Sequence, residues 1–359
     1  GGRVRIRGID FREVLLEREE EFTIATGTSK SALNFVARIE TEDFCGLGSC
    51  CPSSVTGETS DSIREDLQTL SKELIGGEAT EIQALNEKMA SSRPESNCAR
   101  ACLDIALWDL IGKASGRPLY DILGGSRDRM MTDMSIGITD FDHTLERATQ
   151  IVSRGFKAIK MKIGLDIDED IARLMAVREA VPRDIVLSVD ANQGYSYEKA
   201  VEFVKRTRDM GLAYLEQPVS RNDFASLKKL SDLSIVPIMA DESFKSSQEA
   251  ASMLAGGIAR LLNIKILKCG GITESLKIDS ICDAFNAGTQ VGCYSESALS
   301  IAAGLHFALS GSTVEFLDLD SHFTFPNDFA KDALGFESGL LVVSGRPGLG
   351  VEVDFDSLD

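Results

Sequence analysis

Positive charge is scarce in this sequence, and long apolar runs are missing. The 359 residues include 38 Lys and Arg against 56 Asp and Glu, for a formal net charge of -18 and a pI near 4.7. This acidic balance argues against binding to nucleic acid or to anionic lipid, because both require a basic surface. No apolar run approaches the roughly 20 residues that a membrane-spanning helix needs. We therefore expect neither a nucleic acid nor a membrane as partner.

The cysteines and histidines are not spaced as a redox site, a zinc site or a nucleophilic triad requires. The eight cysteines form no CxxC pair, which favours reduced, partly buried thiols. Together with the lack of an apolar signal segment at the start, this predicts a cytoplasmic protein. The three histidines fit neither a metal set nor a triad, and no glycine pair leads into the Lys-Ser/Thr of a phosphate loop.

The first part of the chain has the pattern of an α+β domain. Alternating apolar residues predict strands at Val4–Leu16, Glu21–Ala25 and Leu33–Glu40. Apolar residues three and four apart predict helices at Asp61–Ile75 and Asn97–Lys113. We assign residues 1–125 to this domain.

From Met131 onward, short strand-like runs alternate with amphipathic helical runs, as in a parallel sheet with crossover helices. Eight such runs are enough to close a barrel. We expect an α/β fold, a modified (β/α)8 TIM barrel of (β/α)7β type at residues 126–320. The tail, 321–359, has strand-like runs at 340–345 and 349–355 and is expected to return to the N-terminal sheet, completing the capping domain. The strand-like barrel runs begin at residues 131, 157, 185, 212, 235, 260, 289 and 313.

Three acids, Asp190, Glu216 and Asp241, stand at the ends of consecutive runs, 25 or 26 residues apart. The carboxyl ends of barrel strands meet at one rim, so these carboxylates should converge. Oxygen ligands without His or Cys suit Mg²⁺. A single acid of this kind would be an ordinary helix cap or turn residue, but three in series predict a metal site.

Lysines flank this acid series. Lys160 and Lys162 share one face of their strand, and a neighbouring cation together with the metal would lower a lysine pKa toward that of a usable base. The alternative is a solvated strand edge. Lys268, assigned to the end of the sixth strand, is expected to approach from the opposite side. Lys265, three positions earlier, is expected to face away and to be structural.

Asp318 and Asp320 form a same-face pair at the end of the eighth run. Carboxylates at this position suit a substrate ammonium, which they can hold by charge-assisted hydrogen bonds. The alternative is a solvated acidic turn.

Taken together, these residues resemble the enolase superfamily, in the branch that contains muconate lactonizing enzymes and dipeptide epimerases. The segments 104-DIALWDLIGKASGRPLYDILGG and 56-TGET are similar to parts of that family's capping domain. The resemblance implies that Lys162 and Lys268 are the acid and base, and that Asp190, Glu216 and Asp241 bind Mg²⁺. It also implies supporting or substrate-binding roles for Lys160, Asn192, Ser135 and Gly27.

Within that branch, Asp318-Leu319-Asp320 resembles the Asp-x-Asp of dipeptide epimerases, so a small dipeptide is the expected substrate. Gly27 stands where epimerases of Ala-Glu carry an arginine, which favours a neutral or hydrophobic dipeptide, and Ser49 stands where relatives often have Glu. The alternatives are a muconate cycloisomerase or o-succinylbenzoate synthase-like enzyme and, more remotely, a non-catalytic barrel that binds a metal or a carboxylate. The sequence leaves the oligomeric state open, including a homo-oligomer.

Overall fold

A long antiparallel hairpin opens the fold in the computed structural model, which describes residues 4–358. Strand β1 (Gly8–Ile24) pairs with β2 (Gly27–Glu40), and β2 pairs with β3 (Cys45–Cys50). The two separate strands expected at 4–16 and 21–25 are wrong, because β1 runs through both with one irregularity in its register.

Helices pack directly on this sheet. A side chain on Gly48 would place its Cβ 2.0 Å from the carbonyl oxygen of Cys102, so only glycine allows β3 to lie this close to helix α3. Gly46 and Gly48 interrupt the alternation of apolar residues in β3, which is why this strand was not predicted. Both predicted helices are present, whereas α2 was not predicted. The helices are α1 (Ser60–Leu74), α2 (Ile82–Ser92), α3 (Asn97–Ser115) and α4 (Leu119–Ile122).

Eight parallel strands follow, each beside its neighbour in sequence. The amide of Asp133, just before β5, donates to the carbonyl of Leu317 in β12 at 3.1 Å, which brings the two edges of the sheet together and closes the barrel. The carboxyl ends of the strands therefore meet at one rim. The strands are β5 (Met134–Ile136), β6 (Ala158–Lys162), β7 (Val186–Asp190), β8 (Leu215–Glu216), β9 (Ile238–Ala240), β10 (Leu261–Lys265), β11 (Gly288–Gly292) and β12 (Val314–Asp318).

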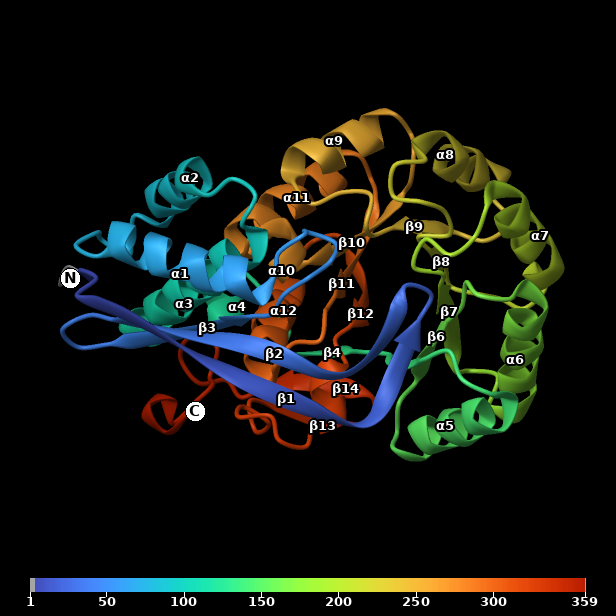
Figure 1. Ribbon diagram of the computed structural model, residues 1–359, viewed down its shortest axis with the longest axis horizontal. Coiled ribbons are helices and arrows are strands. Elements are labelled where there is room, and N and C mark those ends of the chain that lie inside the picture. The colour runs from blue at the N-terminus through green and yellow to red at the C-terminus, as the bar shows by residue number, and fades with distance from the viewer. Residues whose placement is uncertain (1–3, 359) are drawn as a thin grey trace.

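Within the described residues, the first seven barrel strands lead into α-helices and β12 leads into a short 3-10 helix, η1 (Ser321–Thr324), as a (β/α)7β barrel requires. The helices form the outer layer of the barrel in Figure 1. They are α5 (Phe141–Ser153), α6 (Ile167–Ala180), α7 (Tyr197–Thr207), α8 (Phe224–Leu233), α9 (Ser247–Ala255), α10 (Ile266–Cys269), α11 (Ile272–Ala284) and α12 (Ala298–Ser310). Among residues 4–358, none of the helices has the length and apolar character to cross a membrane.

The tail forms strands at a different place from the one expected. Strand β14 (Leu340–Val343) lies between β13 (Leu334–Glu337) and β4 (Arg129–Met131) in a separate three-stranded sheet, rather than joining the N-terminal sheet. Residues 349–353 are not a strand, and η2 (Phe355–Ser357) follows them. Phe355 packs under the guanidinium groups of Arg12 and Arg38, so the end of the tail contacts the hairpin through side chains.

The β1–β2 hairpin extends from the capping domain to the barrel (Figure 1). Near its turn, the carbonyl of Thr23 accepts a 2.8 Å hydrogen bond from the amide of Ile138, which follows β5. Gly164, after β6, faces Ala25 at a distance that leaves little room for a side chain. The hairpin thus lies over the rim of the barrel. Ser49, the residue at which relatives often have Glu, lies on β3 and forms a buried hydroxyl cluster with Ser297 and Ser300.

Candidate active site

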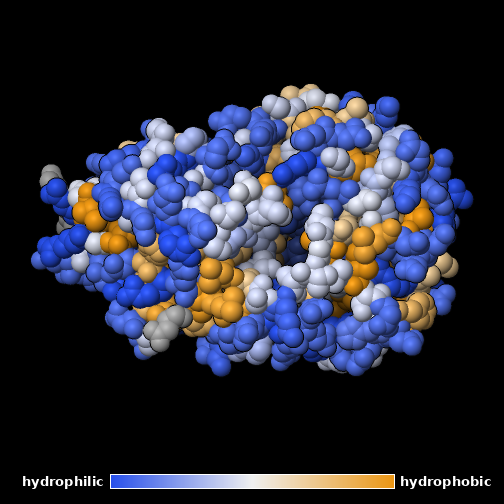
Figure 2. Space-filling model, viewed as in Figure 1, coloured by the Kyte–Doolittle hydropathy of each residue, from blue (hydrophilic) through white to orange (hydrophobic). Residues whose placement is uncertain are grey.

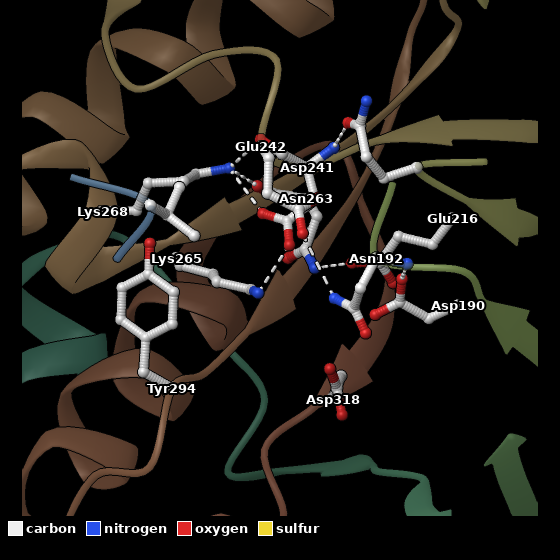
Figure 3. A network of polar contacts seen from close by, with 12 residues as sticks. Asp190, Asn192, Glu216, Asp241, Glu242, Asn263, Lys265, Lys268, Tyr294 and Asp318 are labelled. Atoms are coloured by element: carbon white, nitrogen blue, oxygen red, sulfur yellow. Dashed lines mark hydrogen bonds and ion pairs between the residues drawn. The ribbon is translucent and has the colours of Figure 1, made fainter. Parts of the chain in front are cut away.

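Three buried carboxylates lie at the rim of the barrel. Asp190 and Glu216 end β7 and β8 and are register partners, and Asp241 follows β9 directly. All three are fully buried. Figure 3 shows them converging from neighbouring strands, as the sequence predicted.

The carboxylates of this cluster lie close enough to affect one another's pKa values. Burial raises the pKa of Glu216, with Asp190 adding to the increase. Burial and the charges of Asp241 and Asp190 raise the pKa of Glu242 to about 8. Within this cluster, side-chain oxygens of Asn192, Glu242 and Asn263 are buried without a hydrogen-bond partner. A set of buried carboxylates with unpaired side-chain oxygens beside it fits Mg²⁺.

Lys160 and Lys162, on β6, both point into the barrel, as expected. Lys160 is fully buried and donates to Glu216 at 2.9 Å and to Asp318. Lys162 donates to Asp190 at 2.6 Å and also lines the central cavity. The neighbouring cation, Lys160, does lower the pKa of Lys162, as expected, but it does not decide the direction of the shift. Burial lowers that pKa most, but the charges of Asp190, Asp318 and Glu216 together outweigh burial and raise the pKa above its usual value.

The expected placements of Lys265 and Lys268 need correction. Strand β10 ends at Lys265, and Lys268 lies in the short helix α10, so neither placement from the strand period was right. Lys265 lines the cavity and donates to Asp241 Oδ2 at 2.6 Å. Lys268 is fully buried behind Asp241, where its Nζ donates to Asp241 Oδ1 and to two backbone carbonyls, and it does not line the cavity. Figure 3 shows both lysines approaching Asp241.

We expect replacement of Lys268 with methionine to lower stability more than catalysis. The change leaves buried acceptors without their donor, and breaking a buried ion pair costs about 3 kcal/mol or more. Urea unfolding measures this loss. At saturating magnesium, the folded variant should retain proton exchange within about tenfold, because substitutions that leave the reacting groups in place preserve most of the transition-state stabilisation. A variant of normal stability with no exchange would instead make Lys268 a catalyst.

Two lysines and two carboxylates of the site come from every second strand of the barrel, namely β6, β8, β10 and β12. Strands β6 and β10 are four positions apart among eight, so Lys162 and Lys265 come from opposite walls. Strands β8 and β12 lie midway between them, with Glu216 on one side and Asp318 on the other. A molecule in the cavity can therefore contact one lysine on each face.

A second carboxylate cluster lies at the end of β12. Oxygens of Asp133, Asp318 and Asp320 are within 4.8 Å of one another, and all three residues are buried. The amide of Ser135 donates to Asp320 at 2.7 Å, and the Ser135 hydroxyl lies 3.5 Å from Asp318. Burial raises the pKa of Asp320, and the charge of Asp318 adds to this increase. The cluster can hold a cation.

Asp133 and Glu242 were missed from the sequence. Asp133 shares a strand face with Ser135, two positions later, and Glu242 directly follows a predicted ligand. These sequence positions, next to residues already assigned to the site, are the features from which both acids could have been predicted. Asn192 lies where expected. Its backbone amide donates to Asp190 at 2.8 Å, and its side-chain amide donates to Glu242 at 3.2 Å.

A cavity of about 700 Å³ lies between the hairpin and the barrel rim. The face drawn in Figure 2 is hollowed near its centre. Lys162, Lys265, Asp318 and Asp320 line this cavity, as does Gly27 of the hairpin, which is exposed. Several apolar side chains complete the wall, namely Phe22, Ile24, Val55, Met134, Ile136, Ile138 and Phe323.

Comparison with known families agrees with this architecture. Residues 8–124 match the mandelate racemase / muconate lactonizing enzyme N-terminal domain, and residues 143–357 match the enolase C-terminal domain-like family. The chain belongs to the enolase superfamily. The expected family and the expected barrel with its capping domain are thereby confirmed.

Several relatives in this superfamily align over nearly the whole chain. A hydrophobic dipeptide epimerase of Enterococcus faecalis is 34% identical, over 97% of this chain and 99% of the relative. An L-Ala-D/L-Glu epimerase of Bacillus subtilis is 31% identical, over 97% of both chains. The Enterococcus faecalis dipeptide epimerase, solved with Mg and L-Leu-L-Tyr, superposes with a TM-score of 0.94, over 97% of this chain and 99% of that one.

Proposed function

We propose that this protein is a magnesium-dependent dipeptide epimerase, an isomerase that inverts the α-carbon of the C-terminal residue of a small L,L-dipeptide. The observation that carries the proposal is the placement of Lys162 and Lys265 on opposite walls of one cavity, with a buried acid set between them on one side. Inversion requires a proton to leave one face of a carbon and another to arrive at the opposite face. Two lysines arranged in this way can do both.

In the proposed reaction, the Nζ of one lysine, in its neutral form, accepts the α-proton as the C–H bond breaks. The Nζ of the opposite lysine then donates a proton to the other face, so substrate and product differ only in configuration. Asp190, Glu216 and Asp241 would hold magnesium, supported by Lys160 and Asn192. When bound, magnesium supplies positive charge that stabilises the charge forming on the substrate carboxylate and lowers the pKa of the lysines.

Asp318 and Asp320 would bind the α-ammonium of the dipeptide, with Ser135 holding Asp320 in place. They lie across the barrel from Glu216, so a dipeptide can place its carboxylate at one cluster and its ammonium at the other. Muconate cycloisomerases and o-succinylbenzoate synthases handle substrates without this ammonium, which makes those functions weaker alternatives.

The cavity wall supports a neutral or hydrophobic residue at the C-terminal position. Its apolar side chains come from the hairpin, from the segment after β3, from the first barrel strand and the residues that follow it, and from η1. Gly27 offers no charge for a glutamate side chain, unlike an arginine at that place. The relatives named as hydrophobic dipeptide epimerases add support. The eight cysteines are free thiols, which supports a reducing, cytoplasmic location.

A dipeptide library tests the proposal. L,L-dipeptides are incubated with the protein and Mg²⁺ in heavy water, and mass spectrometry follows their mass. We expect a gain of one mass unit in a subset of dipeptides with apolar C-terminal residues. No gain in any dipeptide, together with turnover of a cycloisomerase or synthase substrate, would overturn the proposal.

A further inference from the structure

A buried arginine without an acidic partner lies in the cavity wall. Arg18, on β1, is only 8% exposed, although Glu17 and Glu19 on either side of it are exposed. Its guanidinium donates to two hydroxyls, those of Thr324 at 2.5 Å and Ser295 at 2.7 Å, and its Nε is buried without a partner. Among residues 4–358, no carboxylate lies within ion-pairing distance of it.

The aromatic rings of Phe22 and Phe325 hold this guanidinium in place. The guanidinium carbon lies 5.2 Å from the centre of the first ring and 4.6 Å from the centre of the second. Burial lowers the pKa of Arg18, and Asp320 opposes this effect. An arginine stays protonated in proteins. The cavity wall therefore contains a largely buried positive charge, which the two neutral hydroxyls do not neutralise.

Arg18 lies beside the carboxylate pair assigned to the substrate ammonium. Arg18 donates to Ser295, and the thiol of Cys293, two residues earlier, donates to Asp320 at 3.7 Å; Arg18 and Asp320 both line the cavity. In a dipeptide, the carbon that bears the ammonium also bears the N-terminal side chain. An ammonium held at Asp320 therefore places that side chain in the same cavity as Arg18.

We infer that Arg18 selects dipeptides with an acidic N-terminal residue, glutamate or aspartate, by binding its side-chain carboxylate. The inference rests on the proposed function. A carboxylate accepts two parallel hydrogen bonds from a guanidinium, and such pairs are about twice as strong as neutral ones. Asp318 and Asp320 bind the ammonium of the same residue, so the two charges of an N-terminal glutamate meet opposite charges.

The nearby glutamates do not cancel this preference. Glu19, Glu20 and Glu21 are exposed, and Glu20 lies 3.3 Å from His143. Water and salt screen exposed charges of this kind, whereas the buried Arg18 is screened much less.

The test compares L-Glu-L-Leu with L-Gln-L-Leu, which have nearly the same shape and differ in charge. The rate of deuterium incorporation at the leucine α-carbon, measured below saturation with Mg²⁺ in heavy water, gives kcat/KM. We expect the wild type to favour the glutamate dipeptide by about tenfold or more, the effect of one charge-assisted pair. In Arg18→Met, kcat/KM should fall about tenfold or more for L-Glu-L-Leu, mainly through KM, and change less than about threefold for L-Gln-L-Leu, so that the preference is lost.

Two further variants separate recognition from structure. Arg18→Lys keeps the charge without the planar fork and should keep part of the preference. Arg147→Met removes an equal charge at the cavity rim, where Arg147 donates to Gln150, and should leave the preference unchanged. Equal losses on both dipeptides in Arg18→Met, or equal wild-type rates on both, would overturn the inference and leave the proposed function standing. If no dipeptide exchanges, the proposed function itself fails.

Discussion

Replacement of Lys265 with alanine is expected to abolish epimerisation while leaving proton exchange on one substrate epimer. Lys265 reaches the cavity from the wall opposite Lys162, so each lysine faces one side of the α-carbon. Loss of a general acid or base costs about 10²- to 10⁴-fold in rate. The remaining lysine can still remove a proton from its own face and return a deuteron there.

The complementary variant makes this pattern decisive. Lys162→Ala should also lose epimerisation, but it should exchange the other epimer. Incubation of the L,L and L,D forms separately in heavy water, followed by NMR, measures each exchange. Lys157→Ala, an exposed lysine just before β6, is the matched control and should behave as wild type. If both epimers exchange equally in either lysine variant, the two-base arrangement is wrong.

Glu216→Gln is expected to remove magnesium binding and, with it, epimerisation. Glu216 is fully buried, and one of its oxygens accepts a hydrogen bond from Asn263 while the other accepts one from Lys160; a glutamine keeps the shape of the side chain but only one of these acceptors. The variant therefore changes charge more than packing. Loss of even an outer-shell partner lowers metal affinity about 10- to 100-fold, so loss of a direct ligand should lower it by about 100-fold or more. Calorimetric titration with Mg²⁺ measures this.

Thermal unfolding provides a second measurement on the same variant. A ligand that binds only the folded state stabilises it by about 2.7 kcal/mol at 100 times its Kd, so magnesium should raise the Tm of the wild type but not of Glu216→Gln. Asp133→Asn, in the second carboxylate cluster, is the control and should retain the shift. Retention in Glu216→Gln with loss in Asp133→Asn would place the metal at the second cluster.

The sequence predicted the barrel and its acid series because both depend on local patterns. Parallel strands bring their carboxyl ends together wherever they repeat, so the intervals between Asp190, Glu216 and Asp241 were enough to place them. Asp318 and Asp320 were placed by the same argument.

The errors arose where the local pattern changed. The two-residue period was applied through Lys268, but the chain leaves strand geometry after Lys265 and forms one helical turn, which ends at Gly270 with a φ of 88°. Arg18 was not singled out because its burial depends on residues near 295 and 324, far away in sequence. The pairing of β14 with β4 likewise depends on tertiary contacts that no periodicity shows.

The most direct test of the central claim is proton NMR of one dipeptide, L-Glu-L-Leu, with the wild type and Mg²⁺ in heavy water. We predict that the leucine α-proton signal disappears while signals of the L,D diastereomer grow to equilibrium, and that the glutamate α-proton persists. If the leucine α-proton remains and no second diastereomer forms, and the same holds for the dipeptides of the library, the protein is not a dipeptide epimerase.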